Sequence, residues 1–322
     1  MSKQFAESFF PSTLALLHHY VPSVIDWALP PNLDVTCPEV VLTLPAQDSK
    51  VPLSIRHPTL AAGALVGLLV GVVGWRRYRR DQASWANAFI YFGAMNTVTL
   101  PLHCVLPRAL HLSKPHQYPM LWMLDCLFTG LSSICLVMGG LQMAWNMCAP
   151  PKQRRNQSVA RILQLLELAC YGLILIMLGC AHVVGHPMID FRTGLPEEND
   201  NSDDFWWKEP LFVEWVYLGP VLMALWICPP VVLSTLYQAF SRRTANRYAL
   251  IASITIMAFG VGCAVLGLVG TTLLCRWWPL DVGYLPALVF GGCAISFAGM
   301  YFWLSQLHGV LPRMSSHYGK QQ

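Results

Sequence analysis

Four polar side chains lie in two apolar segments of the chain. Asn96, Thr99 and His103 share one segment, and Asp125 comes early in the next. Thr99 and His103 are four residues apart, so on a helix they occupy the same face. A charged or ionisable side chain inside hydrocarbon costs roughly 2.5–3.5 kcal/mol unless it has a partner. We therefore expect His103 and Asp125 to interact with each other or to belong to a functional site.

A second pair with helical spacing is His182 and His186, also four residues apart. Two histidines on one helix face beside a carboxylate can hold zinc with a water in an open position. The metal would lower the pKa of that water towards neutrality and make it a hydrolytic nucleophile. Simpler interpretations remain open: His186 precedes Pro187 and can face solvent, and Asp125 can accept a hydrogen bond from His103 or Thr99 that joins two helices.

The composition places these residues in a membrane protein. Of the 322 residues, 55% are hydrophobic and 12% are charged, whereas an ordinary soluble domain carries about 25% charged residues. The net charge of +4 comes from short basic clusters between apolar runs, which argues against a nucleic-acid partner. The eleven cysteines include no CxxC pair, so a cysteine zinc knot is not expected.

The apolar runs predict an all-α, polytopic membrane protein with a seven-transmembrane helix bundle, because each run approaches or exceeds the roughly 20 residues that a spanning helix needs. Residues 1–57 form a luminal or extracellular N-terminal segment, with an amphipathic stretch at 9–29 and a loop or short strands at 32–57. Residues 58–310 form the transmembrane domain, and 311–322 a cytosolic tail. The predicted spans are 58–75, 85–107, 119–145, 162–186, 211–236, 249–274 and 284–307.

The distribution of charge predicts the orientation of the bundle. The loops after the first, third and fifth spans are basic, as in the run from Arg76 to Arg80, whereas the loop after the fourth span is acidic. Basic loops favour the cytosolic side, so the N-terminus is expected outside and the C-terminus in the cytosol. The sequon Asn156–Gln157–Ser158 then lies on the cytosolic side and should stay unmodified.

This topology brings polar residues from several spans to one level. In the outer third of the bundle we expect Thr99, His103, Asp125, His182, His186, Glu214 and Asp281. Glu167 lies near a cytosolic span end, where we expect its carboxylate to snorkel to the interface.

The run Met95–Asn96–Thr97–Val98–Thr99–Leu100–Pro101–Leu102–His103, followed by Met123–Leu124–Asp125, resembles the motifs of the CREST superfamily. These are seven-span membrane hydrolases, and the closest branch is that of the GPI-remodelling lipases and alkaline ceramidases. The resemblance implies a zinc site in which Thr99 takes the place of the family serine, His103 is a zinc ligand and Asp125 is the general base.

The chain departs from that family in its last span. The family's Asp-x-His-x-x-x-His run corresponds here to Asp281–Val282–Gly283–Tyr284–Leu285–Pro286–Ala287, so both histidine places are empty of ligands. A catalytic zinc normally takes three protein ligands. Either the metal site is lost, or His182 and His186 rebuild it from the fourth span; we favour loss.

The function expected from the sequence is the handling of a lipid or GPI-type substrate near the outer leaflet by a CREST-like, multi-pass membrane protein of the secretory pathway or plasma membrane. Whether it is an enzyme stays open, because it can be a catalytically degenerate relative of a zinc-dependent amide or ester hydrolase. Two alternatives are a seven-transmembrane receptor, whose signatures are missing, and a small-solute transporter in which Asp125 and His103 relay protons, which lacks an inverted repeat. The oligomeric state is not indicated.

Overall fold

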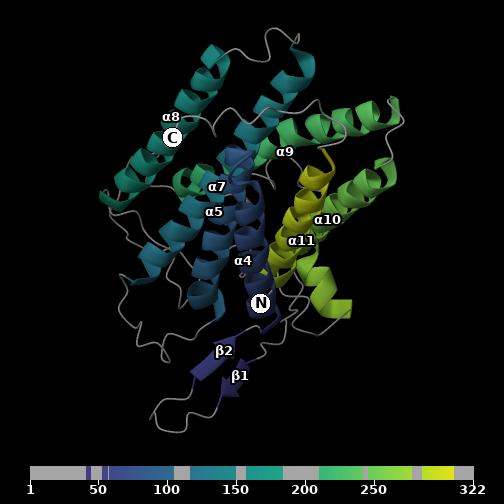
Figure 1. Cartoon of the computed structure of the whole chain (residues 1–322). Coiled ribbons are helices and arrows are strands. Elements are labelled where there is room, and N and C mark those ends of the chain that lie inside the picture. Colours follow the sequence, from purple (N-terminus) through teal and green to yellow (C-terminus); the bar gives the residue numbers. More distant parts are fainter. Residues whose placement is uncertain are drawn as a thin grey trace.

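The computed structural model describes residues 41–44, 53–56, 58–104, 117–149, 157–183, 210–241, 246–277 and 285–307. These ranges are almost entirely helical (Figure 1). The elements in chain order are the strands β1 (Val41–Leu44) and β2 (Leu53–Arg56), the helices α4 (Pro58–Tyr78) and α5 (Ala83–Thr99), the π-helix η1 (Leu100–Cys104), and the helices α7 (Gln117–Cys148), α8 (Gln157–Val183), α9 (Pro210–Ser241), α10 (Arg247–Trp277) and α11 (Leu285–Gln306).

Within the described ranges, six helices are long and apolar enough to cross a membrane, which agrees with an integral, multi-pass membrane protein. They contain the segments Pro58–Tyr78, Met123–Cys148, Arg161–Gly179, Gly219–Ser241, Arg247–Gly267 and Ala287–Gln306. The second predicted span, 85–107, coincides instead with α5, which has 17 residues, and with η1, which continues it without a break. The short strands expected within 32–57 are present as an antiparallel hairpin that pairs Val41 with Arg56, whereas the amphipathic stretch at 9–29 lies outside the described residues.

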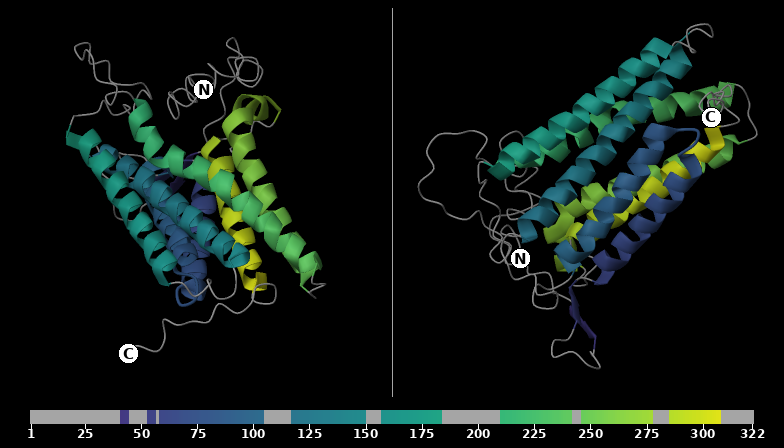
Figure 2. Two further views of the ribbon diagram at one scale, coloured as in Figure 1. Left: turned by 90° about the horizontal axis from the view of Figure 1, so that it is seen from above. Right: turned by 60° about the vertical axis from the view of Figure 1, so that its left-hand side comes forward.

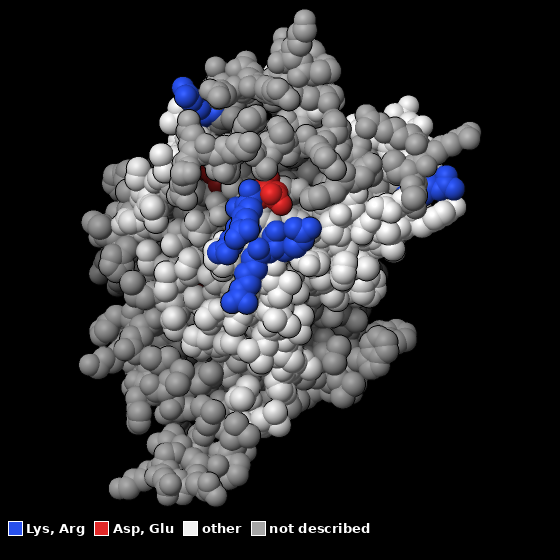
Figure 3. Space-filling model, in the orientation of Figure 1, with Lys and Arg blue, Asp and Glu red and all other residues white. Residues whose placement is uncertain are grey.

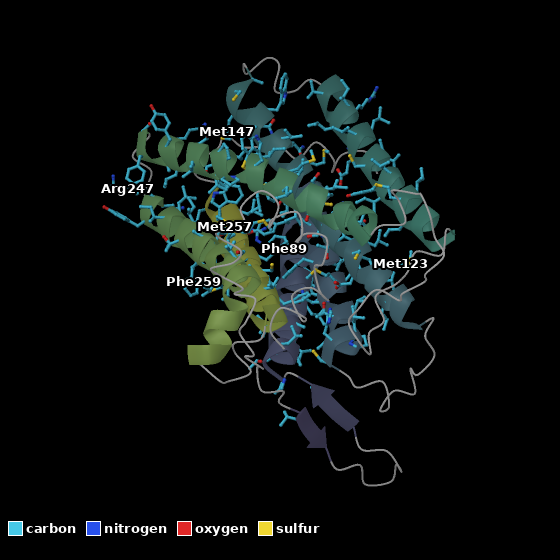
Figure 4. All side chains as sticks on the ribbon, turned by 180° about the vertical axis from the view of Figure 1, so that it is seen from behind. Phe89, Met123, Met147, Arg247, Met257 and Phe259 are labelled. Carbon is cyan, nitrogen blue, oxygen red and sulfur yellow. The ribbon has the colours of Figure 1, made fainter. Side chains whose placement is uncertain are left out.

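The helices divide into a packed centre and a more exposed periphery (Figure 2). α4 packs against α5 and α11, and α7 packs against α5 and α9, while α10 packs mainly against α11. Of the six apolar segments, that of α7 is the most buried and that of α8 the least. Phe89 of α5 lies inside the bundle, whereas Phe259 of α10 is 62% exposed (Figure 4). Large exposed apolar side chains spread over whole helices are typical of surfaces that face lipid rather than water.

Glycines let neighbouring helices touch at their backbones. A Cβ added to Gly71 of α4 would lie 2.7 Å from the Cα of Gly93 in α5, and a Cβ on Gly260 of α10 would lie 2.5 Å from the carbonyl oxygen of Gly292 in α11. Such close approach is how helices associate in a membrane, where van der Waals contact replaces the hydrophobic effect. The pairs α4–α5 and α10–α11 are therefore tight antiparallel hairpins.

Two clusters of buried side chains identify the two ends of the bundle. At one end, Tyr78, Trp85, Leu250 and Trp303 join the end of α4, the starts of α5 and α10, and the end of α11. We call it the basic end, because it carries the arginines Arg76, Arg77, Arg79, Arg80, Arg161 and Arg247. A group of basic side chains is visible there over the end of α4 (Figure 3).

The opposite end, which we call the hairpin end, lies next to β1 and β2. There Leu60 of α4 and Cys104 of η1 are buried, and the partly buried Ile55 of β2 and Ala287 and Phe290 of α11 pack against them. The hairpin end therefore brings together the start of α4, the end of the α5–η1 rod and the start of α11.

Candidate functional site

A hydrogen bond between α5 and α7 joins two of the residues predicted to form the site. The hydroxyl oxygen of Thr99 lies 3.2 Å from Oδ1 of Asp125 and 3.0 Å from the carbonyl oxygen of Met95. Thr99 is fully buried, and the single proton of its hydroxyl is shared between these two acceptors. The structure therefore contains the interhelical hydrogen bond to Asp125 that the sequence left open as one interpretation.

Asn96 lies one helical turn before Thr99 in the same packed layer. Its amide nitrogen donates to the carbonyl oxygen of Phe92 at 2.8 Å, while its Oδ1 is buried without a hydrogen-bond partner among the described residues. The amide is pressed against α4, since a Cβ on Gly67 would lie 2.6 Å from it. Leaving a buried acceptor unsatisfied costs about 1–3 kcal/mol. The absence of a side chain at Gly67 makes room for the Asn96 amide.

His103 is positioned by η1 rather than by a regular α-helix. Pro101 has no N–H group and its ring clashes with the carbonyl four residues earlier, and the chain responds with the wider turn of a π-helix over Leu100–Cys104. Such π-turns occur often at functional sites. The His103 ring lies 5.9 Å from the ring of Phe290 in α11, tilted by 50°. The histidine thus lies at the hairpin end, facing the start of the last helix.

The residues around His103 show whether a zinc site of the family type fits this chain. Ala287 takes one of the two places in which the family carries a histidine, and it lies in the apolar cluster around Cys104; Gly283, the other place, is outside the described residues. Phe290, which faces His103, offers no ligand atom either. In the described part of the chain, no group of three or more His, Cys, Asp or Glu side chains could hold a metal ion. The described residues therefore do not fit a catalytic zinc.

The remaining predicted site residues cannot be compared with this geometry. His182 is in the last turn of α8 and Glu214 in the first turns of α9, but the structure describes neither side chain. His186 and Asp281 lie outside the described residues. The convergence of all seven polar residues stays a prediction, of which the Thr99–Asp125 contact is the described part.

Comparison with known proteins adds no further constraint. No protein-family model matches the chain, and no curated protein matches it. The site has to be interpreted from its own residues and contacts.

A second polar cluster, in the half of the bundle nearer the basic end, was not anticipated from the sequence. The Glu167 carboxylate of α8 is half-buried and faces α5 and α7. Its Oε2 accepts a hydrogen bond from Ser84 at 3.2 Å, and its Oε1 accepts from the Tyr171 hydroxyl and lies 3.7 Å from the Cys135 sulfur. The i,i+4 spacing of Glu167 and Tyr171 was the available signal, since residues four apart share a helix face.

Proposed function

We propose that this protein is a divergent, CREST-like multi-pass membrane protein that binds a lipid or GPI-type headgroup near the non-cytosolic leaflet and has lost the catalytic metal. The observation that carries the proposal is the hydrogen bond between Thr99 and Asp125. It lies on the same helical rod as His103, towards the hairpin end. An intramembrane carboxylate that faces the bundle interior is a functional-site candidate in its own right.

The proposal takes α5 together with η1 as the seventh span. The 17 residues of α5 and the five of η1 form an unbroken helical rod, which is about 30 Å long at a rise near 1.5 Å per residue. That length matches the hydrocarbon thickness of a typical bilayer. With seven spans and the positive-inside bias, the basic end faces the cytosol and the hairpin end faces the lumen or exterior.

The polar groups suit recognition of a lipid headgroup. An ionised carboxylate is an acceptor only and pairs with hydroxyl or ammonium donors, and both are present in inositol- or ethanolamine-containing headgroups. Thr99 keeps Oδ1 of Asp125 oriented across the α5–α7 contact. The Phe290 ring next to His103 supplies an apolar surface at the same end. The arrangement thus combines a hydrogen-bond acceptor with apolar walls, the usual make-up of a small-molecule site.

Binding is favoured over hydrolysis because the start of α11 provides no metal ligand. Ala287, which takes one of the family's two histidine places, is partly buried against apolar neighbours. Without a third ligand, metal-bound water is not available as the nucleophile. Asp125 then acts as a binding residue rather than as a general base.

The test is to identify lipids that co-purify with the full-length protein by mass spectrometry and to compare Asp125→Asn with Asp81→Asn. Both variants replace one carboxylate by an amide, but Asp81 is exposed in the turn between α4 and α5 at the basic end. We expect the wild type and Asp81→Asn to retain a lipid with a hydroxyl- or amine-bearing headgroup, and Asp125→Asn to lose most of it. Equal lipid content in all three proteins would overturn the proposal.

Metal analysis of the same preparations tests the second half of the proposal. We expect zinc well below one equivalent per chain in protein purified without chelators. Near-stoichiometric zinc that falls in a His103→Ala variant would show instead that a metal site persists, and the hydrolase interpretation would replace the binding one.

A further inference from the structure

The end of α4 and the turn after it carry a dense group of exposed positive charge. Four arginines fall within five consecutive residues, and all four side chains are exposed: Arg76, Arg77, Arg79 and Arg80. They form the group of basic side chains over the end of α4 (Figure 3). The exposed Asp81 follows them, so this stretch keeps a net charge of +3. Within the described ranges, no carboxylate forms an ion pair with any of the four arginines.

The backbone that carries these arginines is fixed by Tyr78, which lies in the middle of the group. Tyr78 is fully buried, its hydroxyl donates to the Tyr301 carbonyl oxygen of α11, and its ring stacks on Phe89 of α5. The backbone amides of Asp81 and Gln82 donate to the Tyr78 carbonyl oxygen at 3.1 and 2.9 Å. The arginines therefore extend from a well-packed turn rather than from a loose loop.

Two of the guanidinium groups are also oriented by aromatic rings. The guanidinium carbon of Arg79 lies 4.9 Å from the centroid of the Trp75 ring, and that of Arg77 lies 5.6 Å from the centroid of the Tyr78 ring. Both distances are within the range of about 6 Å for cation–π contacts. Such a contact orients the guanidinium but supplies no oxygen acceptor to its five N–H donors. The donors can therefore bind an anion from outside the described part of the chain.

The position of the group points to a membrane lipid as the source of that anion. The arginines come at the end of a helix that is long and apolar enough to cross a membrane, and Trp75 is of the residue type that is enriched at the headgroup level. Four or more basic residues directly after a span are typical of sites for anionic lipids. The guanidinium fork matches the oxygens of a phosphate group. A phosphate monoester carries a charge of about −1.5 to −2 at pH 7, which balances the net charge here better than a singly charged headgroup does.

We propose that the four arginines at the end of α4 form a binding site for an anionic glycerophospholipid whose headgroup ends in a phosphate monoester, in the leaflet at the basic end. This site is separate from the Thr99–Asp125 site, which lies towards the hairpin end. It involves neither that hydrogen bond nor His103.

Native mass spectrometry of the full chain in detergent, titrated with phosphatidic acid and with phosphatidylcholine, tests the site. We expect the wild type to bind phosphatidic acid more tightly than phosphatidylcholine. Each arginine near a membrane surface contributes about fivefold to the binding of an anionic lipid, so the double variant Arg77→Gln/Arg79→Gln should bind phosphatidic acid about 25-fold more weakly. Equal affinity of the wild type for the two lipids would overturn the proposal.

A matched double variant separates a site from general surface charge. Arg161→Gln/Arg247→Gln removes the same charge from the same end of the bundle, but from α8 and α10, and should bind phosphatidic acid nearly as tightly as the wild type. Equal weakening in the two double variants would overturn the proposal. Arg77→Lys/Arg79→Lys keeps the charge but lacks the planar fork, so it should bind less tightly than the wild type; unchanged affinity would leave only general attraction of charge.

Two further measurements identify the ligand and its location. An excess of glycerol 3-phosphate, which carries the same phosphate monoester without acyl chains, should not displace the bound phosphatidic acid. Displacement at equal concentration would show that the arginines bind a soluble phosphate and would overturn the lipid as ligand. Asp125→Asn should keep the affinity for phosphatidic acid. Loss of binding in Asp125→Asn but not in Arg77→Gln/Arg79→Gln would place the lipid at the Thr99–Asp125 site instead.

Discussion

Two carboxylates within the apolar helices, Asp125 and Glu167, accept hydrogen bonds from hydroxyl groups of other described residues. Asp125 is hydrogen-bonded by Thr99 across two helices, and Glu167 by Ser84 across two helices and by Tyr171 within one. The sequence reveals that such residues exist, because a carboxylate stands out in an apolar run. It does not reveal their partners, because a hydroxyl group within a span is compatible with many environments, including a bond to its own helix.

At this scale, we predict that Thr99→Val destabilises the folded protein by about 1–2 kcal/mol. Valine keeps the shape of the side chain but removes the donor to Asp125, leaving a carboxylate in an apolar layer with one partner fewer. Unfolding of the purified protein by a denaturing detergent measures the change. Thr99→Ser retains the hydroxyl and should lose less; equal losses for the two variants would show that the methyl group, and not the hydrogen bond, contributes.

At the scale of the elements, the glycines of α4 decide how close α5 can come. A Cβ on Gly71 would meet the backbone of Gly93 and of Phe89, and neither can move without shifting the helix. Gly172 of α8 has no atom within 4 Å of a Cβ at its position. These two glycines therefore provide a matched pair of substitutions, one in a helix contact and one in open space.

We predict that Gly71→Ala costs about 1–3 kcal/mol because it overpacks the α4–α5 contact. Gly172→Ala should leave stability unchanged or raise it by up to about 1 kcal/mol, because alanine is the better helix former. The same unfolding assay compares the two. If Gly71→Ala is as stable as the wild type, the two helices are not in backbone contact.

The π-helix η1 is the element that sets the position of His103. We predict that Pro101→Ala relaxes η1 towards α-helical spacing, turns His103 away from Phe290 and reduces the co-purified lipid several-fold, with little loss of stability. Pro229→Ala is the matched control, because Pro229 also lies inside a helix but is exposed on α9. Equal lipid content in the two variants would show that lipid binding does not depend on the π-turn.

At the scale of the whole molecule, the sequence predicts the apolar helices well and their faces poorly. Six long, apolar helices at the positions of predicted spans follow from length and composition, whereas the hairpin of β1 and β2 was only one of two alternatives, a loop or short strands. The inward face of a span does not, because lipid and the protein interior are equally apolar and leave no amphipathic pattern. For the same reason, the sequence does not show that the half-buried Glu167 carboxylate is hydrogen-bonded by Ser84 of α5.

The orientation of the molecule gives a fourth prediction. Gln47→Asn creates the sequon Asn-Asp-Ser between β1 and β2 without changing Asp48 or Ser49. If the hairpin end is luminal during synthesis, we expect this variant to be glycosylated and the native sequon at Asn156 to stay unmodified, as shown by a glycosidase-sensitive change in gel mobility. Modification at Asn156 in the wild type would reverse the orientation.

The backbone contacts made by glycine have a consequence for the way the protein is made. Gly71 meets Gly93, and Gly260 meets Gly292, so each contact joins helices that are consecutive in the chain. Local contacts form early because short connections impose a small entropic cost. The helices α4 and α5 can therefore associate while the ribosome is still translating α7, and α10 and α11 can do so without waiting for earlier segments. Assembly then reduces to joining the two finished hairpins through α4 and α11, while α7 packs against α5 and contacts α8 and α9.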